Sequence, residues 1–295
     1  MSDAATLAVM QSPVPPISLR RRLTDHLMTG LAILTVILVL APLIAIFGYL
    51  LYKGLASVSW AFLTQTPKPP GEVGGGVANG IVGSILILAI ASLLGVPLGI
   101  GAGIYLAEYG RDRLGDAVRF TADVLNGVPS IVTGIVAFAI VVLYQKHFSA
   151  LAGGVALAIM MVPTISRTTE EMLLLVPQAL REAAYGLGIP RWRTTLSITL
   201  RSATSGVITG VMLAFARVAG ETAPLLFTTL GNEFWNANLN QPTAALPLEV
   251  YNYAKSPYDD WHRQAWAGAL ILIILIVGAI AAVRYAVRRG NFGTS

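Results

Sequence analysis

Two charged residues four positions apart, Arg217 and Glu221, interrupt an otherwise apolar stretch over residues 202–230. A charged side chain at the centre of a bilayer costs about 2.5–3.5 kcal/mol on insertion scales, so both are expected to face a polar interior. This four-residue spacing puts them on one helix face, where they can pair and share that cost, although arginine before glutamate is the weaker order. Arg217 would then offer a planar guanidinium to an oxyanion, with Glu221 holding it in place. The alternative is a buried structural ion pair between helices.

A second segment with functional potential joins a short helix to a glycine-rich turn, over residues 176–201. Pro177 is suited to begin a helix and residues 181–185 favour one. The helix is expected to end at a turn that contains Gly186, Gly188 and Pro190. A basic aromatic patch follows at residues 191–193. We expect a rigid knob between two apolar spans, able to transmit force to a docked partner; the alternative is an ordinary amphipathic loop helix.

Residue types exclude several kinds of chemistry. The chain has no cysteine, which removes disulfides, thiolate metal sites and a cysteine nucleophile. Its three histidines lie far apart at the ends of apolar segments, so no metal site is expected (His26, His147 and His262). None of its lysines follows a glycine, as a phosphate-cradling Walker A loop requires. We therefore expect no cofactor and no enzyme activity in this chain, and any ATP would be hydrolysed by a partner.

The composition is that of a membrane protein. Hydrophobic residues make up 55% of the 295 residues and charged residues only 12%, with a mean hydropathy of +0.69. A helix needs about 20 apolar residues to cross the hydrocarbon. Six stretches come near or exceed this length, at residues 27–52, 79–107, 120–144, 151–166, 202–230 and 264–287. The fourth contains Pro163 and is expected to continue as a helix to about residue 175. We predict an all-α membrane protein with about six transmembrane helices.

These spans divide the chain into four parts. An N-terminal tail covers residues 1–26, and the first transmembrane helix with its following loop covers residues 27–73. A core of five transmembrane helices covers residues 74–287 and contains the loop at residues 177–201. A C-terminal tail covers residues 288–295.

The distribution of basic residues predicts the orientation. Six spans place both termini on one side, which then holds 14 of the 20 lysines and arginines, against five on the other side. Because basic loops stay in the cytoplasm, both termini are expected there. The loop over residues 231–263 is then outside the cytoplasm.

Small residues recur at four-residue spacing within two of the spans. They are Gly95, Gly99 and Gly103 in the second span and Gly206 and Gly210 in the fifth. This spacing puts the glycines of each span on one helix face and allows helix backbones to approach closely. We interpret both faces as helix-packing surfaces.

The segment over residues 177–201 resembles the EAA loop of ABC-importer permeases. The match consists of Glu182-Ala183-Ala184, then Gly188 after three residues, then Ile198 and Leu200 after nine more. It departs from the family at its end, where Arg201 and Ser205 replace two usual prolines. In that family the loop is a coupling helix that sits in a groove of the ATPase subunit. The resemblance implies a coupling role for Arg181, Glu182, Ala183, Ala184 and Gly188.

Other segments resemble the phosphate-specific permeases of the PstA type. The clearest is the Arg-x-x-Gly-Glu-Thr-Ala-Pro run at residues 217–224, and further matches lie at residues 74–84, 105–109, 127–132 and 163–170. In that family an intramembrane arginine and glutamate matter for phosphate passage, which implies this role for Arg217 and Glu221. A second arginine in the fourth span is implicated there and corresponds to Arg167. The implied fold is a type I ABC importer permease (MetI-like) bundle in the bacterial inner membrane.

The resemblance implies a subunit that moves inorganic phosphate into the cytoplasm as part of a larger importer. Its implied partners are a PstC-type permease, a dimer of PstB-type ATPases and a PstS-type phosphate-binding protein. Two other functions stay open. One is an ABC permease for another oxyanion, such as molybdate or sulfate. The other is an ion-coupled secondary transporter or channel, which would transport alone and use Arg217 and Glu221 as a charge relay.

Overall fold

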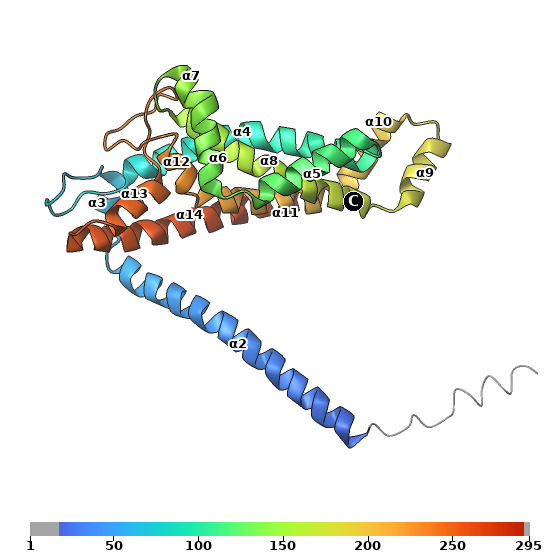
Figure 1. Ribbon diagram of the computed structural model, residues 1–295, viewed down its shortest axis with the longest axis horizontal. Helices are drawn as coiled ribbons and strands as arrows, with labels where there is room; N and C mark the ends of the chain where they lie inside the picture. Colours follow the sequence, from blue (N-terminus) through green and yellow to red (C-terminus); the bar gives the residue numbers. More distant parts are fainter. Residues whose placement is uncertain (1–17, 292–295) are drawn as a thin grey trace, which may run out of the picture. The chain divides into compact units, whose positions relative to one another are not determined.

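The computed structural model describes residues 18–291 (Figure 1). Within those residues the regular elements are helices, and Leu230 and Thr243 form one isolated bridge. The chain divides into two compact units, residues 1–51 and 52–295, which are described separately. Most of the predicted N-terminal tail, residues 1–17, and the end of the C-terminal tail, residues 292–295, lie outside the described residues.

The first unit is most of α2 (Leu19–Leu55), a helix of 37 residues. It contains the predicted first span and begins earlier, so that the three arginines at residues 20–22 form part of its first turn. At about 1.5 Å per residue it is longer than a hydrocarbon core about 30 Å thick. Its length and apolar composition make it a candidate membrane span.

The central helix of the second unit is α8 (Ala150–Leu174), which packs against α4 (Ala78–Glu108) and α11 (Leu200–Ala219). α8 continues through Pro163 to Leu174, as predicted for the fourth span. Glycines make the close contacts on both sides: a Cβ atom added at Gly99 would lie 2.7 Å from Ile165. The same holds for Gly95 and Gly103 of α4 and for Gly206 and Gly210 of α11, which all face α8. The predicted glycine packing faces are confirmed.

The contacts between α4 and α8 show that these two helices run parallel. Facing residues rise together, from Gly95 opposite Met161 to Gly103 opposite Thr169. The chain that leaves the end of α4 must therefore return along the whole bundle before it can begin α8. The connecting residues 109–149 make this return, so they count as one crossing, and the described residues contain six candidate spans in total, as predicted.

This third crossing is not the single stretch expected over residues 120–144. It consists of α5 (Arg113–Gly127), α6 (Ser130–Ala137), the π-helical η1 (Phe138–Val142) and α7 (Leu143–Gln145), with a bend of 109° between α5 and α6. The break lies at Pro129, whose ring disfavours the helical conformation for the residue before it. Val128 accordingly has φ −70° and ψ 133°.

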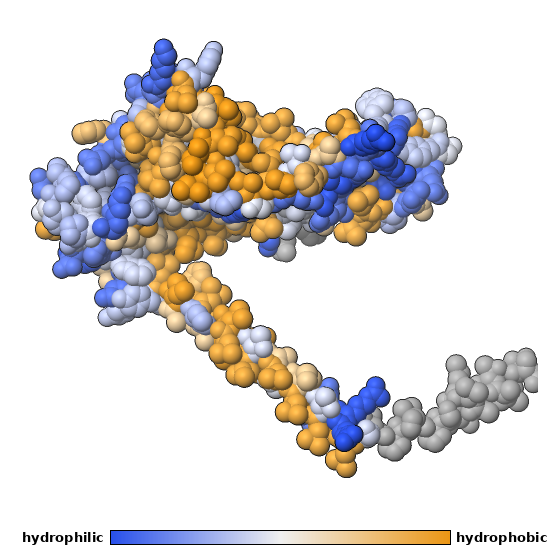
Figure 2. Space-filling model, in the orientation of Figure 1, coloured by the Kyte–Doolittle hydropathy of each residue, from blue (hydrophilic) through white to orange (hydrophobic). Residues whose placement is uncertain are grey.

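The remaining helices complete the two ends of the bundle. At one end lie α9 (Gln178–Gly186), α10 (Arg191–Thr194) and the π-helical η2 (Thr195–Thr199), and the last two lead directly into α11. At the other end lie α3 (Trp60–Thr64), α12 (Ala223–Leu226) and α13 (Leu246–Ala254). The last span is α14 (Asp259–Asn291). Figure 2 shows apolar residues along the middle of the bundle and hydrophilic residues at both ends.

The glycine contacts generate a test with a matched control. Gly99→Ala places a methyl group against Ile165, whereas Gly101, on the same helix, has no atom within 4 Å of an added Cβ. Overpacking typically costs about 1–3 kcal/mol. We expect the thermal unfolding midpoint of the detergent-purified protein to fall for Gly99→Ala. Gly101→Ala should leave it unchanged or slightly higher, because alanine favours helix. Equal midpoints for the two variants would contradict the packing described here.

Candidate functional site

Arg217 lies at mid-depth of the bundle. α11 runs antiparallel to α8, because Gly206 faces Met172 and Gly210 faces Thr168. Continuing this register places Arg217 at the level of Met161, near the middle of the 25 residues of α8. Its side chain is exposed in this single chain and has no ion-pair or hydrogen-bond partner among the described residues. The predicted mid-span cation is therefore present, with its guanidinium available to a ligand.

Glu221 does not share a helix face with Arg217, so that prediction is wrong. α11 ends at Ala219, Gly220 caps it, and Glu221 lies in the turn that follows. Its backbone N–H donates to Val218 O at 3.2 Å, and within the described part of the chain its carboxylate pairs with no cation. Glycine commonly ends helices, and a proline nearby, here at position 224, cannot continue one. The two residues are near in sequence but do not form the expected pair.

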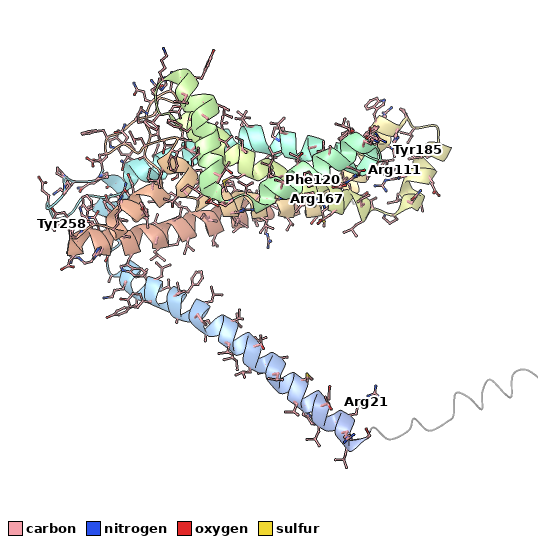
Figure 3. All side chains as sticks on the ribbon, viewed as in Figure 1. Arg21, Arg111, Phe120, Arg167, Tyr185 and Tyr258 are labelled. Carbon is pink, nitrogen blue, oxygen red and sulfur yellow. The ribbon has the colours of Figure 1, made fainter. Side chains whose placement is uncertain are left out.

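Arg167, which is labelled in Figure 3, belongs to a network of charges between α5 and α8. Its Nε lies 3.0 Å from Asp123 Oδ1, and its Nη1 lies 2.8 Å from Glu170 Oε2. The other oxygen of Glu170 lies 2.6 Å from Arg119 Nε. Glu170 is the buried centre of this network, with 4% of its side chain exposed, whereas 56% of the Asp123 side chain is exposed.

The sequence contained a signal for this network that the prediction did not use. Asp116, Arg119, Asp123 and Asn126 recur at spacings of three or four, which puts them on one face of α5. That face lies against α8, where Thr164 Oγ1 donates to Asn126 Oδ1 at 3.0 Å. Because residue 126 faces 164 and residue 123 faces 167, the break at Pro129 lies at the level of Met161, as Arg217 does.

The two arginines therefore differ in what they offer an anion. Arg217 has an unoccupied guanidinium, whereas Arg167 already binds two carboxylates. An oxyanion can bind Arg217 directly, but at Arg167 it would have to displace Asp123 or use the remaining N–H groups. Among the described residues, no group of three histidine, aspartate or glutamate side chains is placed to hold a metal ion.

The predicted knob is present as α9 and the turn after it. Pro177 precedes α9, and the helix ends before Gly188, which has φ +73°, a conformation that favours glycine. Glu182 and Ala183 are exposed while Ala184 is buried. Leu187 and Trp192 leave 81% and 62% of their surfaces exposed at the same end. Exposed apolar side chains of this size beside a short helix are suited to a protein contact surface.

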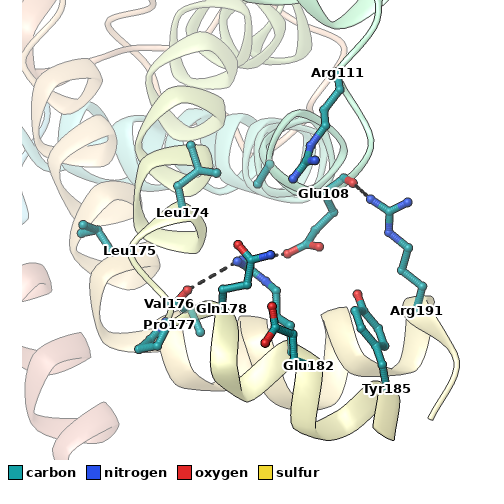
Figure 4. Close-up of a pocket in the computed structure, with 12 residues that line it drawn as sticks. Glu108, Arg111, Leu174, Leu175, Val176, Pro177, Gln178, Glu182, Tyr185 and Arg191 are labelled. Atoms are coloured by element: carbon teal, nitrogen blue, oxygen red, sulfur yellow. Dashed lines mark hydrogen bonds and ion pairs between the residues drawn. The ribbon is translucent and has the colours of Figure 1, made fainter. Parts of the chain in front are cut away.

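A pocket of about 520 Å³ separates α9 from the ends of α4 and α8 (Figure 4). Glu108, the last residue of α4, lies in it with 5% of its surface exposed. Its Oε1 lies 3.0 Å from Nη2 of Arg181. The resemblance implied a coupling role for Arg181, whereas Glu108 lies in the matched segment at residues 105–109 and was assigned no role of its own.

The opposite end of the bundle contains a third buried carboxyl, Glu249 of α13. It lies over the first turn of α4 so closely that a Cβ atom at Gly80 would overlap it. Burial raises the pKa of Glu249 from 4.5 to about 8, assisted by the negative charge of Glu233 and opposed by the nearby Asn79 amide. Glu249 is therefore largely protonated at neutral pH.

The bundle and its exposed loop helix define the membrane subunit of a transporter, and comparisons with known proteins specify which kind. Residues 95–290 match the family described as binding-protein-dependent transport system inner membrane component. The phosphate transport system permease protein PstA of Yersinia pestis is 47% identical over 272 residues, which cover 91% of this chain and 92% of that protein. PstA 1 of Mycobacterium tuberculosis is 33% identical over 306 residues, 98% of this chain and 99% of that protein.

The fold has a counterpart among solved structures. An inward-facing MetNI methionine ABC transporter superposes with a TM-score of 0.54 at 18% identity, covering 72% of this chain and 94% of that one. The chain belongs to the binding-protein-dependent inner membrane transport permeases and, within them, to the PstA group of phosphate permeases. It is a multi-pass inner membrane protein that works with other subunits of an ABC transporter.

The network around Glu170 predicts an asymmetric response to charge removal. Glu170→Gln leaves Arg119 and Arg167 without their buried carboxylate, and breaking a buried pair costs about 3–5 kcal/mol. Asp116→Asn removes a carboxylate that is 80% exposed and pairs with the same Arg119, where a cost of about 0–1 kcal/mol is expected. We expect a clear drop in the thermal unfolding midpoint for Glu170→Gln only. Similar midpoints for the two variants would count against a buried centre at Glu170.

Glu249 predicts a dependence of stability on pH. Between pH 4.5 and about 8 the carboxyl is ionised in the unfolded chain but protonated in the folded one, so the free energy of unfolding falls as pH rises across this window. Glu249→Gln should flatten that fall when thermal unfolding is followed from pH 5 to pH 8. The control Glu72→Gln, at an exposed loop carboxylate, should keep the wild-type slope. An unchanged slope in Glu249→Gln would show that another group is responsible.

Proposed function

We propose that this chain is the PstA-type permease subunit of an importer that moves inorganic phosphate into the cytoplasm. The observation that carries this proposal is the 47% identity to a PstA phosphate permease over 91% of the chain. The chain itself would perform no covalent chemistry and bind no nucleotide, and a separate ATPase would supply the energy. Family membership favours this function over the ion-coupled secondary transporter, and the curated relatives favour phosphate over molybdate or sulfate.

In this proposal Arg217 contacts the phosphate on its way through the membrane. Its unpaired guanidinium at mid-depth supports that role, because a planar fork of N–H donors suits a tetrahedral oxyanion. Glu221, in the turn that follows, would adjust the charge of the pathway without holding Arg217. Arg167 would act from its carboxylate network, nearer the α9 end.

The proposed partners are a PstC-type permease, two PstB-type ATPases and a PstS-type binding protein. The exposed face of α9, with Glu182 and Ala183, supports docking of an ATPase at that end. Arginines gather at the same end, which supports a cytoplasmic location for α9. A cytoplasmic location for both termini rests on the basic residues beside them in the sequence, at residues 20–22 and 284–289. The exposure of Arg217 supports a pathway completed by the second permease.

The function is tested by reconstituting the complete complex in proteoliposomes. We expect ATP-dependent uptake of phosphate, with ATP hydrolysis stimulated by the phosphate-loaded binding protein and not by molybdate or sulfate. The permease alone should give no flux. Flux through the lone chain, or stimulation by another oxyanion, would contradict the proposed function.

Arg217→Gln in the same complex tests the proposed pathway residue. A hydrogen bond to a charged group contributes about 1.5–3 kcal/mol, so uptake should fall on the order of 10- to 100-fold. Arg113→Gln, at an exposed arginine near the start of α5, is the control and should transport normally. Normal uptake by an assembled Arg217→Gln complex would remove Arg217 from the pathway.

A further inference from the structure

Two arginines, one on each side of the turn after α9, converge on the same residue at the end of α4. Arg181 of α9 pairs through Nη2 with the Glu108 carboxylate at 3.0 Å. Arg191, the first residue of α10, donates from Nη2 to the backbone oxygen of Glu108. The guanidinium of Arg191 also lies 4.6 Å from the centre of the Tyr109 ring. Both the side chain and the main chain of Glu108 are therefore held by the loop helix segment (Figure 4).

These polar contacts bridge a hollow. The pocket of about 520 Å³ lies between α9 and the ends of α4 and α8, and its lining includes Glu108, Arg181 and Arg191. On this side the pocket takes the place of a closely packed interface, and the contacts of Arg181 and Arg191 with Glu108 cross it. A displacement of α9 would thus reach α4 mainly through the arginines.

Arg181 also contacts the segment at the end of α8, in addition to Glu108 of α4. Its Nη2 also donates to Leu173 O at 2.7 Å, in the last turn of α8, and its Nη1 donates to Val176 O at 3.4 Å, two residues after that helix ends. Cations near the last carbonyls of a helix are favoured by the helix dipole. One side chain of α9 therefore touches the ends of both α4 and α8.

α4 is suited to carry such a displacement into the membrane. Its glycine face is in close contact with α8 at three successive positions, Gly95, Gly99 and Gly103, so we expect a displacement at the end of α4 to be passed along this packed interface. The carboxylate at its end is 95% buried, and a buried ion pair is a costly way to achieve anchoring alone.

We infer that Glu108 is the positioning residue that receives the movement of α9 through Arg181 and Arg191 and passes it to α4. This inference rests on the proposed function, in which α9 docks the ATPase. The first step by which movement of the ATPase reaches the membrane helices of this chain is thereby assigned to Glu108, which lies at the end of α4 and not in α9.

The test is Glu108→Gln in the complete reconstituted complex, with phosphate uptake and ATP hydrolysis measured together. We expect the ATPase to co-purify and to hydrolyse ATP as before, while phosphate taken up per ATP falls on the order of tenfold, within the usual range of coupling energies. The control is Glu171→Gln, at an exposed carboxylate in the last turn of α8, which should keep the wild-type ratio. An unchanged ratio in Glu108→Gln would overturn the inference, as would loss of the ATPase from the complex.

A charge exchange keeps the inference testable if Glu108→Gln does not fold. Arg181→Glu alone should uncouple uptake from hydrolysis, and Arg181→Glu combined with Glu108→Arg should restore part of the ratio. No restoration would overturn the inference. A separate variant tests the proposed function on which this inference rests. Ala183→Asp, on the exposed face of α9, should prevent binding of the ATPase. If the ATPase still binds to this variant, the proposed docking role of α9 fails, whatever Glu108→Gln shows.

Discussion

Close approach of α4 and α11 to α8 is the constraint from which the rest of the structure follows. Glycines on both outer helices remove the side chains that would hold the backbones apart, and the facing residues then have little freedom to slide. This fixed register makes α4 and α8 parallel and α11 antiparallel to them. It also sets the depth of each charged residue, including Arg217 opposite the middle of α8.

Within this frame the buried charges occur as pairs, and the pairs join helices that the glycines do not join. Glu170 binds arginines from α5 and α8, so it attaches α5, the first half of the broken third span, to the central helix. Glu108 binds arginines from α9 and α10, so it attaches the loop helix to α4. Both carboxylates are nearly fully buried. Arg217 differs because it is exposed and because no carboxylate among residues 18–291 pairs with it.

The sequence predicted individual helices better than the contacts between them. The glycine spacing identified the contact faces of α4 and α11, because that pattern depends on a single helix. The knob at α9 was predicted for the same reason, from Pro177, Gly186 and Gly188. The Arg217–Glu221 pairing failed because it assumed an unbroken helix, although Gly220 and Pro224 both argued for an end.

Residues whose importance lies in a partner from a distant part of the chain were missed. Glu108 and Arg181 are 73 positions apart and Arg119 and Glu170 are 51 apart, so local spacing contains no information about either pair. The polar face of α5 was visible, but its residues fall at the edge of an apolar stretch and resemble part of a loop.

The interruption at Val128 and Pro129 has a consequence for solvent inside the membrane. A broken helix leaves main-chain amide and carbonyl groups without their usual partners, and hydrocarbon cannot supply substitutes. In this chain those groups lie at the same depth as Arg217. The surface that carries them must therefore border water or another polypeptide rather than acyl chains. The bend thus identifies a part of the bundle surface that does not face lipid.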